Sequence, residues 1–572
     1  MNDLLTPITA AEDKNGWLRL LIPFFIILLT FAVFLPALHN GFVGWDDPET
    51  LLLNQKYRGL GLQQLKWMFT TFHMGPYQPL SWATYGMDYL LWGMNPFGYH
   101  LTNVVLHSVN AVVFYFLCLE LLSLSIRPGT PAEEREIYIP AGFAALFFAL
   151  HPLRVESVAW VTERRDVLSG LFCLLAALWY IQPRSASGAK VPFWRRHLLP
   201  LAAFLLSLLS KGSAVSLPLA LIVLDIYPLK RLPLSPRRWA APEFRGIWLE
   251  KIFFFALAEA FGAIGYAGQA KGSVIISYQE NGLAARAAMM LFAAAFYVRK
   301  TLVPVGLAAL YQLPRDFGLM NSQSFLAAAM LTAVTVAAAA LRRKWPAVLA
   351  AWACYLVLLA PVSGIVRFGS QAAADRYTYL PCLGFAVLAG SGLLACRRAA
   401  YKPLKGVCLI LACLIIPALA RLTWRQERVW QNSETLWRNA LAVNPENNIA
   451  HNNLAGYLVS QGKFDEAAAH YTEALRLTPD FAEAHNNLAG ILAMHGNFDE
   501  ALRHCLEAAR YEPSFSQAHF NAGIALTRLG RPEQAALQYR EALRINPDYD
   551  QARYNLNSLL SKRGKPGPGV KH

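Results

Sequence analysis

Two adjacent carboxylates give the sequence its first candidate for chemistry. Asp46 and Asp47 follow the first long apolar run, within the stretch Gly-Phe-Val-Gly-Trp-Asp-Asp-Pro-Glu (residues 41–49). Neighbouring carboxylates repel each other, which can raise the pKa of one of them and suit it to act as a general base or a metal ligand. As an isolated motif, such a pair is more often a solvated turn or a helix cap.

Further charges are confined to short segments between apolar runs. Segment 151–166 carries seven ionisable or imidazole side chains: His151, Arg154, Glu156, Glu163, Arg164, Arg165 and Asp166. Lys211 stands alone between the apolar runs 197–210 and 214–228. Another polar set lies before and at the start of the run 377–395: Arg367, Gln371, Asp375, Arg376 and Tyr379. Charge between membrane helices is costly and is usually paired or functional.

These residue types favour group transfer from a phosphate. Arginine and lysine stabilise a phosphate leaving group, and a carboxylate can accept the proton of an incoming hydroxyl. The sequence contains no glycine-rich phosphate loop, GxSxG elbow or HExxH motif. The set therefore favours transfer from a lipid phosphate over nucleotide hydrolysis. A divalent cation on Asp46 and Asp47 and a metal-free reaction both stay open.

Membrane helices are the elements that must position these residues. The chain has 572 residues, of which 55% are hydrophobic and only 16% charged, too apolar for an ordinary soluble protein. The runs of near-spanning length are 17–38, 99–122, 139–151, 166–182, 197–210, 214–228, 250–270, 322–341, 345–362, 377–395 and 405–420. We therefore predict an all-α fold that begins with a polytopic bundle of about eleven transmembrane helices.

Basic clusters predict the orientation of the bundle. They fall at Arg184/Lys190/Arg195/Arg196, Lys230/Arg231/Arg237/Arg238, Arg342/Arg343/Lys344 and Arg397/Arg398/Lys402/Lys405, in alternate loops if all the runs above span. Because Lys and Arg collect in cytoplasmic loops, the net charge of +15 indicates orientation rather than nucleic-acid binding. The N-terminus is then cytoplasmic and the C-terminus lies on the opposite side. The interrupted stretch 285–303 does not cross in this scheme.

The C-terminal part repeats with a period of 34 residues, in units 448–481, 482–515 and 516–549. Prolines and glycines recur at that spacing: Pro445, Pro479, Pro513, Pro547, and Gly462, Gly496, Gly530. The pattern matches the tetratricopeptide repeat (TPR), a pair of helices, with its tryptophan replaced by His451, His485 and His519. A three-histidine metal site is the alternative, but equivalent positions lie about a repeat apart, which favours packing.

An asparagine column runs through the repeats. Asn453, Asn487, Asn521 and Asn555 share one repeat position, on the first helix of each unit. A carboxamide both donates and accepts hydrogen bonds, so a row of them can hold an extended peptide whatever its side chains. We predict a sequence-tolerant peptide-binding face, with packing between repeats as the alternative.

Several short motifs together resemble one enzyme family. Gly-Phe-Val-x-x-Asp-Asp (41–47), Tyr-Gln-Pro-Leu (77–80), Asn-Pro-Phe-Gly-Tyr-His-Leu-Thr-Asn (95–103), segment 151–166, Ser-Lys (210–211) and Asp-Arg-Tyr-Thr-Tyr-Leu-Pro (375–381) occur in this order. They resemble the transmembrane and tetratricopeptide-repeat-containing (TMTC) O-mannosyltransferases and their bacterial relatives. Gly212 after Lys211 and the short repeat array depart from the vertebrate pattern, and the compact array and the run 217–229 look closer to the bacterial relatives.

The resemblance implies a GT-C glycosyltransferase fold with its site on the lumenal or periplasmic face. It implies a catalytic role for Asp46 as base, with Asp47 in support. The residues expected to bind the donor phosphate are Arg165, Lys211 and Arg376, and those expected at the sugar or behind it are His151, Glu156 and Asp166. The sugar donor would be carried on a polyprenyl or dolichyl phosphate.

The predicted function is transfer of mannose or another hexose from this donor to Ser or Thr of a protein acceptor held by the repeats. Location in a bacterial inner membrane is expected, with the endoplasmic reticulum as alternative. The rival functions are a non-enzymatic TPR scaffold for envelope proteins and a lipid-linked sugar flippase or transporter. The predicted domains are a membrane domain 1–420, a connector 421–447 with a partial repeat, a repeat array 448–560 with closing helix 550–560, and a disordered basic tail 561–572.

Overall fold

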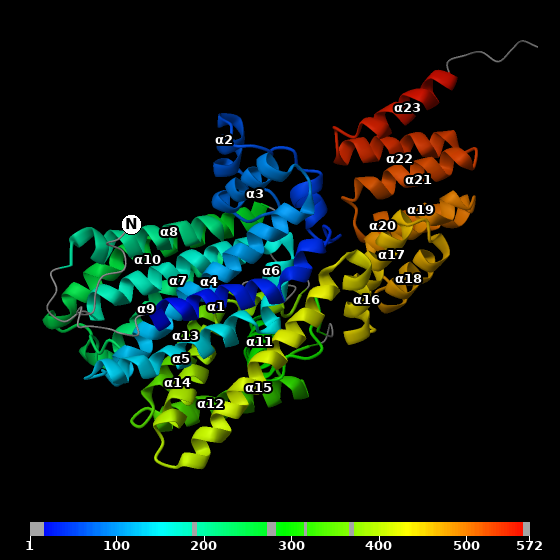
Figure 1. Cartoon of the computed structure of the whole chain (residues 1–572). Helices are drawn as coiled ribbons and strands as arrows, with labels where there is room; N and C mark the ends of the chain where they lie inside the picture. The colour runs from blue at the N-terminus through cyan, green and yellow to red at the C-terminus, as the bar shows by residue number, and fades with distance from the viewer. Residues whose placement is uncertain (1–16, 186–190, 272–281, 314–316, 365–370, 564–572) are drawn as a thin grey trace, which may run out of the picture. The chain divides into compact units, whose positions relative to one another are not determined.

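The computed structural model describes residues 17–185, 191–271, 282–313, 317–364 and 371–563. Within these residues the protein is all-helical, and the one β-bridge joins Tyr311 to Ala373. The chain divides into two compact units, the first ending at Asn432 and the second beginning at Ser433. Figure 1 shows the helices of each unit along the chain.

In its described residues the first unit contains fifteen α-helices, with several short 3-10 or π turns between them. They are α1 (Trp17–Val33), α2 (Leu62–Thr70), α3 (Pro79–Trp92), α4 (Pro96–Ile126), α5 (Pro131–Ala149), α6 (Val155–Ala159), α7 (Arg164–Ser185), α8 (Leu199–Ser210), α9 (Leu217–Ile226), α10 (Arg245–Lys271), α11 (Leu283–Leu302), α12 (Ser322–Leu341), α13 (Pro346–Leu359), α14 (Leu383–Arg398) and α15 (Lys402–Glu427).

Several of these helices suit a membrane. Among the described residues, four are long and apolar enough to cross one: Pro96–Ile126, Val161–Gln182, Ser322–Leu341 and Pro403–Trp430. The bent pair Ala132–Ala149 and Pro152–Ala159, with 54° between its halves, would be a fifth. Shorter apolar helices lie at Leu20–Val33, Gly212–Ile226 and Pro346–Val362. The chain is a multi-pass membrane protein, as the composition predicts, whereas the count of eleven spans stays a prediction.

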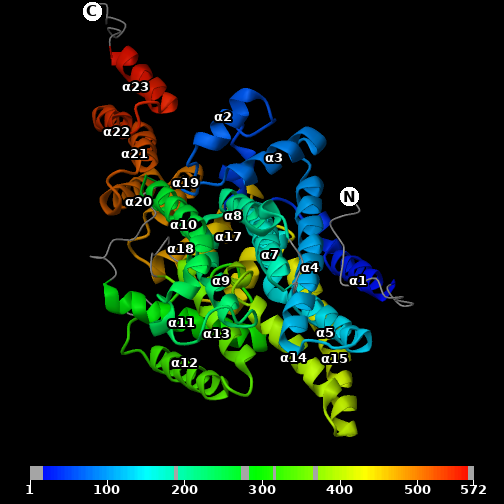
Figure 2. The same ribbon diagram turned by 90° about the vertical axis from the view of Figure 1, so that its left-hand side faces the viewer.

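Helix α4 lies at the centre of the part of the bundle that matters for the site. It packs against α7, α5 and α1, and Figure 2 shows α7 running alongside it. The side chain of Asn95 caps its first turn by accepting a hydrogen bond from the Phe97 amide, and Pro96 occupies the first helical position. The helix ends at Arg127, which has a left-handed φ of 50°.

One face of α4 carries buried polar residues at helical spacing: Asn103, His107 and Asn110. The Asn103 amide donates to the Val158 carbonyl at 3.1 Å, and the Asn110 amide donates to the Val167 carbonyl at 2.8 Å. His107 Nδ1 and Asn110 Nδ2 lie 2.8 and 2.7 Å from the Tyr379 hydroxyl. This face therefore ties two distant segments, around residues 158–167 and 379, to a single helix.

Segment 152–163 is buried rather than exposed as a loop. It folds as a 3-10 turn, the short helix α6 and a second 3-10 turn, and every residue of it is buried. Two of its backbone carbonyls, those of Val161 and Thr162, lie 3.0 Å from the Tyr85 hydroxyl of α3, which shares its one proton between them. Irregular backbone is tolerated at membrane depth only when protein or trapped water satisfies it in this way. The charged residues of this segment are therefore enclosed by protein.

The second unit is a stack of paired helices. They are α16 (Ser433–Val443), α17 (Asn448–Ser460), α18 (Phe464–Leu477), α19 (Ala482–Met494), α20 (Phe498–Tyr511), α21 (Ser516–Arg528), α22 (Pro532–Ile545) and α23 (Asp550–Arg563). Gly462, Gly496 and Gly530 separate the two helices of each unit with φ of 73°, 83° and 71°, which explains why glycine recurs there. The last residues of the predicted tail, 564–572, lie outside the described residues.

The repeat histidines contact the second helix of their own unit. His451 Nδ1 lies 2.9 Å from His470 Nδ1, His485 Nδ1 lies 2.7 Å from His504 Nδ1, and His519 Nδ1 lies 2.8 Å from Gln538 Oε1. Where TPR sequences place a tryptophan, this chain therefore joins its paired helices by hydrogen bonds between imidazoles or to an amide. No cluster of three metal-ligating side chains occurs among the described residues.

Candidate active site

The two adjacent aspartates have different surroundings. Asp47 is buried, and its carboxylate accepts hydrogen bonds from the Val43 amide at 2.9 Å, the Thr162 amide at 3.2 Å and the Thr162 hydroxyl at 2.5 Å. Asp46 is half-buried, and within the described residues no hydrogen bond engages its carboxylate. Asp47 thus fastens the first loop to the segment before α7, while Asp46 keeps free oxygens.

Burial raises the pKa of both carboxyls. For Asp46 the positive charges of Arg165 and Arg376 partly oppose this rise, so both guanidinium groups act on its carboxylate. For Asp47 burial raises the pKa to about 6, against the three hydrogen bonds that favour the ionised form. A half-buried carboxylate with free oxygens beside two guanidinium groups has the properties of a general base.

Glu163 lies at the centre of the buried charges. Its carboxylate is fully buried and binds Arg165 Nη2 at 2.5 Å and Lys211 Nζ at 2.8 Å. Arg376 Nε lies 3.2 Å from the same carboxylate. One glutamate therefore holds together three cations that come from α7, the turn after α8 and the segment before α14.

Arg376 is held on every side. Its guanidinium pairs with Glu156, which also accepts the Arg376 backbone amide at 2.9 Å, and it donates to Gln371 Oε1 at 2.9 Å. The guanidinium carbon lies 5.3 Å from the ring centre of Trp160 and 5.0 Å from that of Tyr377. Such a guanidinium supplies a fixed positive charge, and Glu156 acts as its support.

Lys211 and Arg165 are the more accessible cations. Each side chain is 15% exposed, compared with 6% for Arg376. Lys211 also binds Asp166 at 2.6 Å, and Asp166 in turn accepts from the Ser157 hydroxyl at 3.2 Å. Within the described part of the chain Arg165 has one hydrogen-bond partner, Glu163, for a group with five N–H donors, so it has donors to offer a ligand.

A small cavity of about 20 Å³ adjoins Lys211 and Arg376. Its lining combines charged and hydroxyl groups with apolar side chains: Asp166, Ser169, Lys211, Ser213, Leu358, Val362, Arg376, Tyr377, Tyr379, Leu380 and Pro381. The volume holds about one water molecule, so a phosphate could enter only if these side chains move apart. A wall that is cationic on one side and apolar on the other suits a phosphate attached to a hydrocarbon chain.

His151 has both ring nitrogens engaged. Nε2 lies 3.0 Å from the Thr301 carbonyl, and Nδ1 accepts from the Leu153 amide at 3.3 Å. It therefore caps the turn that follows α5 and links it to α11. Of the residues predicted at the sugar or behind it, Glu156 and Asp166 contact the proposed phosphate-binding cations, whereas the partners of His151 within the described residues are the Thr301 carbonyl and the Leu153 amide.

An aromatic stack adjoins Asp46. The ring of Trp45 lies 5.1 Å from that of Trp160, and Trp160 is stacked on Trp430 at 5.7 Å with 24° between the rings. Trp160 and Trp430 are buried, and Trp45 is half-buried. The stack fixes the residue before Asp46 against the segment that carries Glu163.

The asparagine column is half-buried and partly used between repeats. The amide of Asn487 donates to Asn452 Oδ1 at 3.3 Å, and that of Asn521 donates to Asn486 Oδ1 at 2.8 Å. Asn453 accepts from its neighbour Asn452 at 3.2 Å, and Asn555 lies 3.5 Å from the Tyr539 hydroxyl. The column thus contributes to packing of adjacent units, and its peptide-binding role stays a prediction.

Comparison with known proteins finds relatives for both the repeats and the membrane unit. The tetratricopeptide repeat family matches residues 418–477, 457–510 and 495–550. Protein O-mannosyl-transferase TMTC1 of Homo sapiens is 26% identical over 433 residues, 70% of this chain and 47% of the relative. TMTC4 of Mus musculus is 28% identical over 503 residues, 80% of this chain and 66% of the relative. This chain is homologous to the TMTC protein O-mannosyl-transferases.

The homology with the TMTC proteins extends well beyond the repeats. Because the repeat unit comprises only residues 433–572, a match over 70% or more of the chain must include a large part of the membrane unit. TMTC3 of Mus musculus, 23% identical over 488 residues, covers 78% of this chain and 50% of its own length. The chain spans about half to two thirds of the length of the curated relatives it matches.

Sequence reasoning assigned no role to Glu163. Charge balance could have pointed to it, because cations buried in a membrane bundle need a carboxylate nearby. Glu163 lies two residues before Arg165 in the sequence. The aromatic stack was also missed, since Trp45, Trp160 and Trp430 are far apart in sequence.

We predict that Thr162→Val lowers the stability of the membrane unit in a pH-dependent way. The substitution removes the 2.5 Å hydrogen bond to buried Asp47, at a cost of about 1 to 3 kcal/mol. With the pKa of folded Asp47 at about 6, the carboxyl is ionised at pH 8 and mostly protonated at pH 5, so the loss should be larger at pH 8. Thermal unfolding of the purified protein in detergent measures both values.

Thr423→Val is the matched control. Thr423 is also buried, but its hydroxyl donates to the Leu150 carbonyl at 2.7 Å, which does not titrate in this range. Its destabilisation should be equal at the two pH values. Equal losses for Thr162→Val at pH 5 and pH 8 would contradict the assignment of Asp47.

Proposed function

We propose that this chain is a membrane glycosyltransferase that moves mannose or another hexose from a polyprenyl or dolichyl phosphate to Ser or Thr of a protein. The homology with the TMTC protein O-mannosyl-transferases supports the class of reaction. The observation that carries the proposal for this chain is the placement of Asp46. Its carboxylate has free oxygens and is under the influence of Arg165 and Arg376, and Arg376 in turn lines a cavity with a cationic side and an apolar side.

In the proposed reaction Asp46 accepts the proton of the acceptor hydroxyl as its oxygen attacks the anomeric carbon. The bond between that carbon and the phosphate oxygen breaks, and the electron pair leaves with the lipid phosphate. Lys211 and Arg165 stabilise the growing negative charge, with Arg376 as a fixed charge behind them. A single displacement of this kind inverts the anomeric centre. Asp47 keeps Asp46 in place through its bonds to Val43 and Thr162.

The proposal does not depend on a metal ion. Both oxygens of Asp47 already accept hydrogen bonds, so a divalent cation at the acidic pair would be held mainly through Asp46. Such a cation would stabilise the phosphate charge, a task for which Lys211 and Arg165 are available.

The topology and the role of the repeats complete the proposal. We place the membrane domain at 1–420 with a GT-C-like bundle of about eleven spans, a cytoplasmic N-terminus, and the active site on the outer or lumenal face. An odd number of spans would put the repeat array on that same side. Asn453, Asn487, Asn521 and Asn555, all half-buried, would then offer their remaining hydrogen-bonding capacity to an acceptor peptide.

We expect Asp46→Asn to lower sugar transfer by about 10² to 10⁴-fold while the protein folds normally, because the variant cannot accept the hydroxyl proton. Glu49→Gln is the matched control, since Glu49 is an exposed acid three residues further along and should retain activity. The measurement is transfer from a synthetic polyprenyl-phosphate mannose to a Ser/Thr peptide by the purified full-length protein. Glycopeptide mass spectrometry of envelope proteins, with and without the gene, identifies sugar and acceptor. Full activity of Asp46→Asn would overturn the proposal.

The pH profile gives an independent test. Burial raises the pKa of Asp46 above the ordinary value of about 3.9, so the rate should fall with decreasing pH earlier than a free aspartate would dictate. Arg165 lowers that pKa, and Arg165→Met should therefore move the acidic limb of the kcat/KM profile to higher pH. Lys56→Met, at an exposed cation of the same loop, should leave it unchanged. An acidic limb unaffected by Arg165→Met would contradict the role of Asp46.

A further inference from the structure

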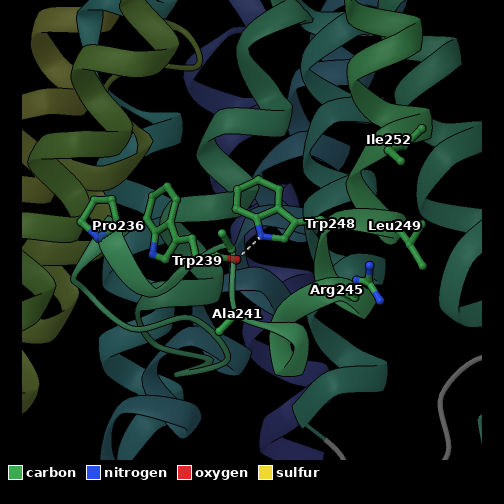
Figure 3. A pocket seen from close by; sticks show the side chains of 8 residues that line it. Pro236, Trp239, Ala241, Arg245, Trp248, Leu249 and Ile252 are labelled. Atoms are coloured by element: carbon green, nitrogen blue, oxygen red, sulfur yellow. Dashed lines mark hydrogen bonds between the residues drawn. The ribbon is translucent and has the colours of Figure 1, made fainter.

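A groove separate from the charged cluster opens at the start of α10. It has a volume of about 670 Å³, within the range of small-molecule sites. Its lining residues come from the stretch before α10 and from the first turns of that helix: Pro236, Trp239, Ala240, Ala241, Arg245, Trp248, Leu249 and Ile252. Figure 3 shows Arg245, Leu249 and Ile252 on one side of the view and Trp239 and Pro236 on the other.

The two tryptophans form an apolar wall whose polar atoms are already satisfied. Trp239 Nε1 donates to the Pro233 carbonyl at 2.8 Å, and Trp248 Nε1 donates to the Trp239 carbonyl at 2.9 Å. Their ring centres lie 5.7 Å apart. A ligand beside them therefore meets ring surface and not a free N–H group.

The exposed face of α10 continues this wall. Arg245, Leu249 and Ile252 follow each other at helical spacing, and Leu249 and Ile252 are 62% and 54% exposed. In a multi-pass membrane protein a strip of exposed aliphatic side chains contacts acyl chains. Tryptophan and arginine at the end of such a strip are typical of the level of the lipid headgroups.

The charge at this end is positive. Within the described residues the guanidinium groups of Arg245 and Arg237 have no ion pair, and both are exposed. Arg238 faces the nearby acid, Glu243, at 3.4 Å, and both of these side chains are largely exposed. One carboxylate beside three arginines leaves a surplus of positive charge, which an anionic headgroup would complement.

We propose that this groove binds an anionic glycerophospholipid. The headgroup phosphate lies against Arg245, and an acyl chain extends along Leu249 and Ile252 beside the rings of Trp239 and Trp248. A zwitterionic lipid of the same chain length carries no net charge to match the arginines. The site is independent of the proposed glycosyl transfer.

Native mass spectrometry of the delipidated full-length protein tests this inference. Titration with phosphatidylglycerol should give a first binding event tighter than with phosphatidylcholine of the same chains. Arg245→Gln should weaken that event about fivefold, the effect of one basic side chain at a lipid surface. Arg245→Lys should restore most of it. Arg343→Gln, at an exposed arginine just after α12, is the matched control and should have no effect.

Three results would overturn the inference: equal affinity for the two lipids, undiminished phosphatidylglycerol binding by Arg245→Gln, or equal loss in Arg343→Gln. Excess inorganic phosphate separates the two sources of a phosphate group. It should not displace the lipid, because it lacks the acyl chain that contacts Leu249 and Ile252. Displacement of the lipid by this excess of inorganic phosphate would show a simple anion site and would refute the lipid assignment.

Discussion

The carboxylate of Glu163 lies fully buried between Arg165 and Lys211, with Arg376 3.2 Å away, and the geometry of the candidate site depends on it. Removing any charge of such a cluster would leave the others uncompensated in a poorly solvated interior. The cluster therefore fixes the relative positions of α7, the turn after α8 and the segment before α14. The cluster also holds these cations in position to bind an anionic ligand, which would then interact with them together with the acidic side chains.

Two supports bring this cluster to Asp46. The polar face of α4, with Asn103, His107 and Asn110, satisfies the irregular backbone around α6 and holds Tyr379. Asp47 joins the first loop to Thr162, immediately before Glu163. The adjacent aspartates thus have different roles. Asp47 uses its oxygens in structural hydrogen bonds, and Asp46 keeps free oxygens near the cations.

The sequence predicted the all-helical membrane part, the TPR array and the TMTC resemblance, because hydropathy and a 34-residue period are local signals. The cost of charge near a membrane drew attention to the polar segments, and the TMTC resemblance nominated Asp46, Lys211 and Arg376 within them. The sequence could not separate phosphate-facing groups from supporting ones. That distinction depends on pairings across more than 200 residues, such as Glu156 with Arg376, and on Glu163, whose importance comes from the fold. The sequence likewise could not show that His151 and the asparagine column already make hydrogen bonds within the protein, because their partners are distant in sequence.

A cryo-EM structure of the full-length protein with bound polyprenyl phosphate tests the central claim most directly. The account predicts phosphate oxygens about 3 Å from Lys211 Nζ and from a guanidinium nitrogen of Arg165, with the isoprenoid chain along Leu358, Val362 and Leu380. The carboxylate of Asp46 should lie on the side of the phosphate where the sugar would be attached. A lipid phosphate bound elsewhere, with the Glu163 cluster closed and unchanged, would contradict the account.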